Sequence, residues 1–400
     1  MTKAHQSSIS RAISTPTPTN NPIMARSVLI AMSGGVDSSV AAALLREQGY
    51  DCQAAMLMMH GAEDPAEAAA VCEQLEIPFY LLDAREEFRS CTIADFISGY
   101  ARGETPNPCV RCNAEVKLKV LLQEADWRGI ELVATGHYAR VQRAGGADKV
   151  ETAGECNPLA ANADCSIPET VKNCHLLFKA RDKDKDQSYM LYRLKQEQLG
   201  RLLLPLGDLT KAEVRELAHK YDLAAADRGD SQDLCFVPDG DYATLIEQEL
   251  GLQEPGDIVD ESGRILGRHR GLIYYTVGQR KGLGLALGEP HFVLRKEKET
   301  NRIVLGKQEK LYTDSVLADN INLIALPQLT GPLAVAAQIR YRSAETAAVI
   351  RPESTAHIVA AFERKVRAPA PGQSIVFYCG EMVVGGGIIR RTVPEKTEES

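Results

Sequence analysis

Two cysteines in unusual surroundings stand more than a hundred positions apart in this chain. Cys112 follows Cys109 in the run Pro-Asn-Pro-Cys-Val-Arg-Cys, where two prolines stiffen the approach. A helix is expected to begin at Asn113 or a neighbour, and a thiol near a helix N-terminus has a depressed pKa and reacts as a thiolate. Cys235 lies in Asp-Leu-Cys-Phe-Val, between apolar residues. Nucleophilic or redox chemistry at sulfur is therefore the first function to consider.

Each cysteine also has other interpretations. The pair Cys109 and Cys112 could be half of a zinc site or a thioredoxin-like redox pair, but the sequence holds no second C-x-x-C and the pair does not follow a first strand. A nucleophile in a substrate loop remains the favoured interpretation. Cys235 follows an expected helix end at Gly229, and taken alone it would more often be a buried structural cysteine.

The elements that must position these thiols begin with a phosphate loop. Ser33 to Ser39 read Ser-Gly-Gly-Val-Asp-Ser-Ser, between an apolar run at 28–32 and an alanine- and leucine-rich run at 40–48. We expect a buried strand, a turn and a helix, an arrangement in which backbone N–H groups and the helix dipole favour an anion. The lysine of a Walker loop is missing, and no G-x-G-x-x-G occurs. The alternative is an ordinary Gly-Gly turn.

The flanking pattern alternates between strands and helices. This alternation predicts an α/β fold with a doubly wound parallel sheet, whose ligands bind beyond the carboxyl ends of the strands. A further helix is expected at 211–220, where Thr210 and Glu213 form a capping box. The other strands are expected at 50–57, 77–82 and 130–135, and the other helices at 65–75, 88–102 and 113–125.

The sequence pattern changes after Pro255, where glycine-rich turns separate short apolar runs. Regular short strands of this kind predict a small β-barrel at the end of the chain. Strands are expected at 258–259, 273–277, 291–294, 303–305, 334–340, 347–350, 357–362, 374–378 and 382–389. The predicted domains are a nucleotide-binding domain at 27–232 with a surface insertion at 143–174, a small central domain at 233–312, and a barrel at 313–400.

Composition limits the class of protein. The chain has 400 residues, 44% hydrophobic and 25% charged, with a formal net charge of −8, and no apolar run long enough to cross a bilayer. Its ten irregularly spaced cysteines do not predict a disulfide scaffold, so a reducing, bacterial cytoplasm is expected. Residues 1–26 are rich in Ser, Thr, Pro and Asn, which fits a disordered extension, a start at Met24 or an organelle transit peptide.

Several motifs together give a closer resemblance. In order from about Ser27 to about Ile389 the chain holds S-G-G-V-D-S-S, T-P-N-P-C-V-R-C-N, A-T-G-H-Y, K-D-Q-S-Y, S-Q-D-L-C-F, T-V-G-Q-R-K-G-L-G and P-G-Q…G-G-G-I-I. This series resembles the tRNA-specific 2-thiouridylases (MnmA family) of the PP-loop ATP pyrophosphatase superfamily. The resemblance implies an adenine nucleotide α-hydrolase-like domain, a small central domain and a C-terminal β-barrel. It also implies conversion of O2 of a tRNA wobble uridine to sulfur.

The resemblance assigns roles residue by residue. Cys112 would be the first catalytic cysteine and Cys235 the one that carries the persulfide; in many relatives an aspartate stands at the position of Cys109. ATP binding is implied for Ala31, Met32, Ser33, Gly34, Gly35, Val36, Asp37, Ser38, Ser39, Leu57 and Gly136. Contact with tRNA is implied for Asn107, Pro108, Cys109, His137, Lys185, Asp186, Gln187, Arg340, Tyr341 and Gln373.

The implied chemistry is adenylation followed by sulfur transfer. ATP, with Mg²⁺ carried on the nucleotide, would activate the poor leaving group O2, and the persulfide would attack as a soft nucleophile. A disulfide between Cys112 and Cys235 could then form, so each turnover needs a reductant and a persulfide-carrying protein or cysteine desulfurase. No tightly bound metal and no membrane are expected.

RNA contact is expected from local basic patches, since the overall charge is negative. Arg340 and Arg342 flank Tyr341 in the barrel. The alternative is that these basic residues on turns are only exposed to solvent and bind no RNA. A central group consists of Arg264, Arg268, Arg270, Arg280 and Lys281.

Two other functions are compatible with parts of the sequence. One is a PP-loop ligase of the amidotransferase or argininosuccinate synthase type, which uses an amine nucleophile; the other is a zinc-stabilised RNA-binding module without catalysis.

Overall fold

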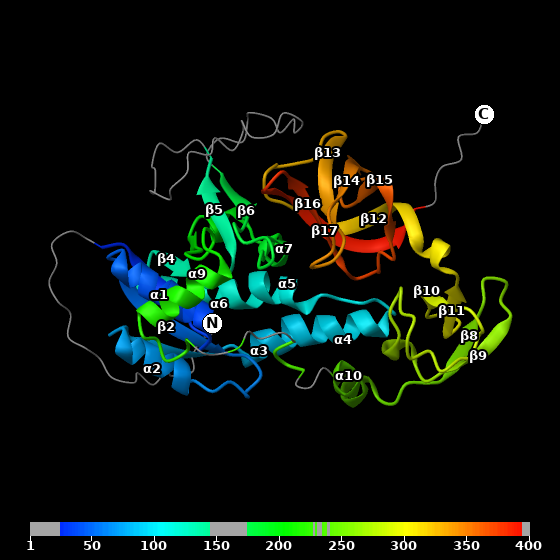
Figure 1. Cartoon of the computed structure of the whole chain (residues 1–400), viewed down its shortest axis with the longest axis horizontal. Coiled ribbons are helices and arrows are strands. Elements are labelled where there is room, and N and C mark those ends of the chain that lie inside the picture. The colour runs from blue at the N-terminus through cyan, green and yellow to red at the C-terminus, as the bar shows by residue number, and fades with distance from the viewer. Residues whose placement is uncertain (1–24, 145–173, 227–228, 230–233, 238–240, 394–400) are drawn as a thin grey trace, which may run out of the picture. The chain divides into compact units, whose positions relative to one another are not determined.

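The computed structural model describes residues 25–144, 174–226, 229, 234–237 and 241–393. The predictions for residues 1–24 and for most of the 143–174 insertion lie outside these residues. Contacts within the chain divide it into two units. The described parts of the first are residues 25–92, 110–144, 174–226 and 229, and those of the second are 93–109, 234–237 and 241–393. Figure 1 shows the elements of both units, which are taken one at a time below.

The first unit contains a five-stranded sheet in which all neighbouring strands are parallel. The prediction of a parallel sheet is therefore confirmed. Because β1 lies between β2 and β4, the strand order reverses at its carboxyl end, the usual ligand position in such sheets. In sheet order the strands are β3 (Phe79–Asp83), β2 (Asp51–Met58), β1 (Ser27–Ala31), β4 (Leu132–Ala134) and β7 (Leu202–Leu203).

Helices bury the faces of this sheet. Val40 and Ala42 of α1 (Val36–Glu47) and Val214 of α9 (Lys211–Lys220) lie in one core with strand residues such as Ile30. The predicted capping box is confirmed, since the Glu213 N–H donates to Thr210 Oγ1 at 3.3 Å and Glu213 Oε2 accepts from the Thr210 N–H at 2.7 Å. The other helices of this unit are α2 (Ala66–Gln74), α3 (Arg85–Glu87), α6 (Leu118–Arg128), α7 (Ser188–Leu191) and α8 (Gln196–Leu199).

Two antiparallel strands not predicted from the sequence complete the first unit. They are β5 (Ala139–Arg143) and β6 (His175–Lys179). Their short, mixed polar composition carries little strand signal by itself. The predicted insertion starts at the end of one strand and stops just before the other, so it connects the two strands of a hairpin.

Six strands of the second unit form a closed barrel (Figure 1). Strand β12 pairs with both β15 and β17, so the sheet has no free edge there. The barrel prediction is confirmed, although no strand was expected at the position of β12. In barrel order the strands are β12 (Tyr312–Leu323), β15 (Ile358–Arg367), β14 (Thr346–Pro352), β13 (Leu333–Gln338), β16 (Ser374–Cys379) and β17 (Met382–Thr392).

The second unit also contains, among its described residues, a smaller sheet and the helices α4 and α10. The expected strand at 273–277 is wrong: Leu272–Tyr274 is a short 3-10 helix, because Gly271 turns the chain at φ +138° and the Tyr275 N–H donates to Leu272 O. Helix α4 (Ala94–Ala101) packs on α10 (Tyr242–Leu250). In sheet order the strands are β10 (Phe292–Glu297), β11 (Arg302–Gly306), β8 (Gly256–Val259) and β9 (Ile265–His269).

Helix boundaries were the least accurate predictions. Helix α1 begins at Val36 instead of Val40, so half of the loop motif belongs to its first turn. The helix expected at Asn113 begins at Pro108, a residue that fits the first position of a helix because it lacks an N–H. It runs as α5 (Pro108–Cys112), a π-helical stretch η2 (Asn113–Lys117) and α6. The helix expected at 88–102 begins earlier, at Arg85 with α3, and continues through a π-helical stretch at Phe88–Ile93 into α4.

Candidate active site

The phosphate loop is held in shape by its own serines. Gly34 has φ +74°, a conformation that favours glycine, and Ser33 N–H donates to Ser38 Oγ at 3.2 Å. The hydroxyls of Ser38 and Ser39 both donate to Gly35 O, at 3.0 and 2.9 Å. These bonds fix the turn between β1 and α1, at the end of the strand where a phosphate can approach the amino end of the helix.

An acid, a phenol and a lysine meet at this loop. Asp37 Oδ1 accepts from Tyr138 Oη at 2.7 Å and from Lys211 Nζ at 2.8 Å. The Lys211 side chain is only 11% exposed. The sequence motif lacks a lysine, and the fold brings one to it from the first position of α9. Lys211 and Tyr138 were missed, and the only sequence signal for Lys211 is that it follows the capping Thr210.

Other predicted nucleotide residues surround the same turn. A Cβ atom on Gly136 would lie 2.8 Å from Ser38 N and 2.9 Å from Asp37 C, so only glycine fits this close approach. Met32 follows β1 and donates its N–H to Ala55 O at 2.8 Å. Leu57 is buried near the carboxyl end of β2. Gly136 thus lies against the loop, while Leu57 marks the end of the neighbouring strand.

His137 is half-buried and neutral. Its Nδ1 is 2.8 Å from Thr135 Oγ1. Desolvation, and then the positive charge of Lys117, lower the pKa of His137 to about 3. Any contact of His137 with RNA would therefore use a neutral imidazole at pH 7.

The Lys-Asp-Gln segment is built into the fold of the first unit. Asp186 Oδ1 accepts from the Ala180 N–H at 2.8 Å, and burial raises the pKa of this carboxyl. Gln187 Oε1 accepts from the Tyr138 N–H at 2.8 Å. Lys185 is half-buried. Asp186 and Gln187 thus have structural hydrogen bonds next to the phenol that reaches Asp37.

Cys112 is buried at the end of α5 and is followed directly by the π-helical stretch. Because the helix begins at Pro108, the expected placement of Cys112 at a helix N-terminus is wrong; Cys109 lies in the first turn instead. π-Helical turns inside helices are frequent at functional sites. The next residue, Asn113, is 4% exposed and donates to Met190 O at 3.3 Å, while its Oδ1 has no hydrogen-bond partner among the described residues.

Cys235 is exposed, in contrast to the alternative of a buried structural cysteine. Its neighbours Leu234 and Phe236 pack on the core around Phe96. The helix end expected at Gly229 is not found, since α9 already ends at Lys220. An exposed thiol on an anchored segment can react with an external sulfur donor.

The barrel residues predicted to contact tRNA already contact this chain. Arg340 donates to Ala368 O, and Gln373 Nε2 donates to Thr105 O at 2.6 Å. Tyr341 lies beside Arg342, whose guanidinium carbon is 5.5 Å from the ring centroid. Of the central basic group, Arg264 is exposed but paired with Asp260, and the Arg270 guanidinium lies over Tyr274 at 3.8 Å.

The described residues contain neither a metal-binding cluster nor a membrane-spanning helix. In that part of the chain no group of three or more His, Cys, Asp and Glu could hold a metal ion. Within the same ranges no helix is long and apolar enough to cross a membrane.

Comparison with known families gives three matches along the chain. A tRNA methyl transferase HUP domain model matches residues 26–239, more than half of the chain. A tRNA methyl transferase PRC-barrel domain model matches residues 243–307, and an aminomethyltransferase β-barrel domain model matches residues 313–389. These limits lie close to the three predicted domains.

Curated relatives are similar over nearly the whole chain. The tRNA-specific 2-thiouridylase MnmA of Halothermothrix orenii is 40% identical over 91% of this chain and 98% of that protein. The protein of the same name from Moorella thermoacetica is 43% identical over 90% and 98%. A solved U34-tRNA thiolase, NcsA from Methanococcus maripaludis, has a TM-score of 0.31 at 18% identity, over 56% of this chain and 67% of that one, too weak a likeness to carry weight.

Proposed function

Since the chain belongs to the tRNA-specific 2-thiouridylase family, we propose that it is an ATP-dependent tRNA 2-thiouridylase that acts on the wobble uridine. The observation that carries the proposal is the phosphate loop, where Asp37, Tyr138 and Lys211 meet at the carboxyl end of β1. This site supplies what adenylation needs, an anion-binding turn with a nearby cation.

ATP would bind with its phosphates on the loop at 33–39. Family membership implies ATP binding, and Mg²⁺ would arrive with the nucleotide. Lys211 would supply the positive charge that the loop motif lacks, and Asp37 and Tyr138 hold its ammonium group in place. Gly136 and Leu57 would border the adenosine. Stabilising the charge that develops on the leaving pyrophosphate is the main contribution expected of such a site.

The first step activates the base. The uridine O2 attacks the α-phosphorus of ATP, pyrophosphate leaves, and the base carries AMP on O2. Oxygen bound to carbon is a poor leaving group, whereas AMP is a good one. The wobble base must leave its loop stack to reach the enzyme, as base-modifying enzymes generally require.

The second step transfers sulfur. The terminal sulfur of a persulfide on Cys235 attacks C2 of the base and AMP leaves. The Cys112 thiolate then attacks Sγ of Cys235, which leaves sulfur on the base and a Cys112–Cys235 disulfide. Alternatively, Cys112 attacks first and releases hydrosulfide, which then attacks C2. Either route oxidises the two cysteines by two electrons, so a thiol reductant must restore them.

Recognition of tRNA would come from the predicted contact residues of both units. These are Asn107, Pro108, Cys109, His137, Lys185, Asp186, Gln187, Arg340, Tyr341 and Gln373. A persulfide-carrying protein or cysteine desulfurase would load the exposed Cys235, and the reaction would take place in the bacterial cytoplasm.

The direct test is incubation of the protein with unmodified tRNA, ATP, Mg²⁺ and a persulfide donor. We expect 2-thiouridine at the wobble position, measured by mass spectrometry of the digested tRNA, together with AMP and pyrophosphate. A ligase with an amine nucleophile would keep its activity in Cys235→Ser, whereas thiolation should be lost. No thiouridine from the wild-type protein with loaded donor would reject the proposal.

A further inference from the structure

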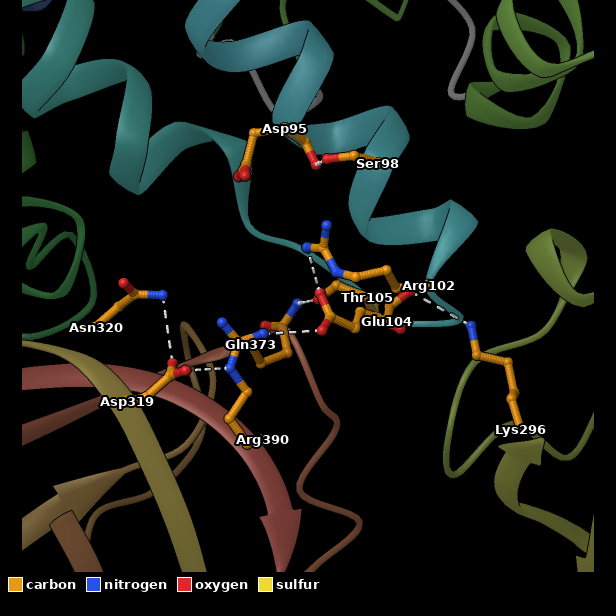
Figure 2. Close-up of polar contacts among 10 residues, drawn as sticks. All are labelled: Asp95, Ser98, Arg102, Glu104, Thr105, Lys296, Asp319, Asn320, Gln373 and Arg390. Carbon is orange, nitrogen blue, oxygen red and sulfur yellow. Dashed lines mark hydrogen bonds and ion pairs between the residues drawn. The ribbon is translucent and has the colours of Figure 1, made fainter. Parts of the chain in front are cut away.

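Helix α4 and the tail that follows it join several parts of the second unit (Figure 2). On the helix, the ring of Phe96 meets Phe236 edge-on with centroids 5.4 Å apart, and meets Tyr242 of α10 in the same way at 6.4 Å. Phe96 and Tyr100 are almost fully buried. The chain that flanks Cys235 is therefore fixed on α4.

Beyond the helix, Glu104 lies between two guanidinium groups. Its Oε1 accepts from Arg390 Nη1 at 2.9 Å and its Oε2 accepts from Arg102 Nη2 at 2.7 Å. Arg390 also donates from Nε to Asp319 Oδ2 at 2.6 Å. The Glu104 side chain is 15% exposed and that of Arg390 is 30% exposed. The alternating charges form one network, which joins the tail of α4 to strands β12 and β17 of the barrel.

The next residue is held through its backbone. Thr105 N–H donates to Pro371 O at 2.8 Å, and Thr105 O accepts from Gln373 Nε2 at 2.6 Å. Gly372, with φ +88°, lies so close that a Cβ atom would be 2.9 Å from Glu104 Cβ. Both polar backbone groups of Thr105 are therefore bound to one barrel loop.

The small sheet holds the same tail. Lys296 of β10 donates from Nζ to Glu104 O at 3.4 Å, and its ammonium lies 5.7 Å from the Tyr100 ring centroid. Burial lowers the pKa of Lys296 to about 8, opposed in part by the charge of Glu104. These two contacts hold the tail from the side of the small sheet.

We propose that Glu104 and Arg390 are positioning residues for sulfur transfer. Their ion pair holds the tail at 104–107 on the barrel, and this tail leads directly into α5, the helix that carries Cys109 and Cys112. The proposed tRNA contacts Arg340, Tyr341 and Gln373 are on the same barrel. The ion pair therefore fixes the start of the cysteine helix, Pro108 and Cys109, on the barrel that is proposed to bind tRNA. This inference rests on the proposed function.

The test measures two products in one reaction. In Glu104→Gln and Arg390→Gln, pyrophosphate release should stay near the wild-type rate, while the amount of 2-thiouridine per pyrophosphate should fall at least about tenfold, since small misplacements of reacting groups have large effects on rate. The effect of the double variant should be smaller than the product of the two single effects, because both single variants remove the Glu104–Arg390 ion pair. A parallel fall of both products would indicate a merely structural role and would overturn the proposal, as would an unchanged ratio.

Two further variants keep the test decisive. Arg390→Lys keeps the charge but cannot bridge both carboxylates, so its ratio should be intermediate; a wild-type ratio would overturn the proposal even if the Gln variants do not fold. Glu297→Gln breaks an exposed ion pair with Arg295 in the same unit and should leave both products unchanged. A wild-type protein that makes no 2-thiouridine would instead reject the proposed function itself.

Discussion

The phosphate loop and the Glu104–Arg390 network both hold a reactive segment with polar bonds, yet they are built from very different stretches of the chain. The serines that shape the loop lie within seven consecutive positions. The network joins residues 104, 319 and 390, which belong to three separate elements. The part of the site that we propose activates a base is thus local in sequence, whereas the part that we propose positions the cysteine helix exists only in the folded chain.

The comparison has one instructive exception. Asp37 of the local loop depends on Lys211, which lies 174 positions away in sequence. The loop motif has no lysine of its own, but the fold supplies a cation, Lys211, from α9. Substitutions in the loop should abolish activation, and substitutions in the network should separate activation from transfer.

The largest expected effect is that of Asp37→Ala. Without the carboxylate, the ammonium of Lys211 and the hydroxyl of Tyr138 lose their shared partner beside the loop. Pyrophosphate release should fall by about 100-fold or more, the size of effect seen when one electrostatic group is removed from an active site. Asp51→Ala, which removes an exposed carboxylate at the start of β2, is the matched control. Normal pyrophosphate release in Asp37→Ala would contradict the role given to this site.

Lys211→Met should have the next largest effect. The Lys211 side chain is 11% exposed, and its ammonium group lies beside Asp37. Its loss should lower the rate of pyrophosphate release roughly 10- to 100-fold, and Lys211→Arg should recover part of that rate. The control is Lys220→Met at the other end of α9, where the side chain is 63% exposed. Equal rates in the Lys211 and Lys220 variants would show that Lys211 does not serve the nucleotide.

Gly136→Ala should act more mildly, through packing. The added Cβ would lie 2.8 Å from Ser38 N, so the first turn of α1 must shift. We expect a loss of about 1–3 kcal/mol in the free energy of unfolding, with weaker ATP binding. Calorimetry and nucleotide titration would measure both. The control is Gly331→Ala, where no atom lies within 4 Å of the new Cβ. Equal losses of stability in the two variants would contradict a tight contact between Gly136 and α1.

The last prediction concerns His137 and the pH dependence of stability. Its pKa is about 3 in the folded protein against an ordinary value of 6.5, so the unfolded chain binds the extra proton between these values. Stability should fall as pH drops from 6.5 towards 3, by up to about 1.4 kcal/mol per pH unit from this residue. His137→Gln should flatten denaturant-melting stabilities measured between pH 4.5 and 6.5. An unchanged pH slope would show that His137 is not held neutral.

Much of the fold could be predicted because its signals are local. Apolar runs predicted the parallel sheet, the Thr210–Glu213 box predicted the start of α9, and regular turns predicted the barrel. The failures have equally physical causes. Pro108 starts a helix inside a run that looked like a loop, and Gly271 turns the chain where a strand was expected. Local preference gave the type of element but not its limits.

The site was predictable only in part. The loop residues could be named from their motif, and an exposed Cys235 agrees with a reactive role. Lys211 and Tyr138 were not named as site residues, although Tyr138 ends the A-T-G-H-Y motif, because each reaches Asp37 only through the fold. Arg390 is one of many arginines in the sequence, and only its position between Glu104 and Asp319 distinguishes it.

The most direct test of the central claim, that base activation and sulfur transfer are separate tasks of distant residues, is one assay on Cys112→Ala. Pyrophosphate and 2-thiouridine would be measured together, with unmodified tRNA, ATP, Mg²⁺ and a persulfide donor. We expect pyrophosphate release close to the wild-type rate and no 2-thiouridine. Normal thiolation, or loss of pyrophosphate release in a folded variant, would contradict the account.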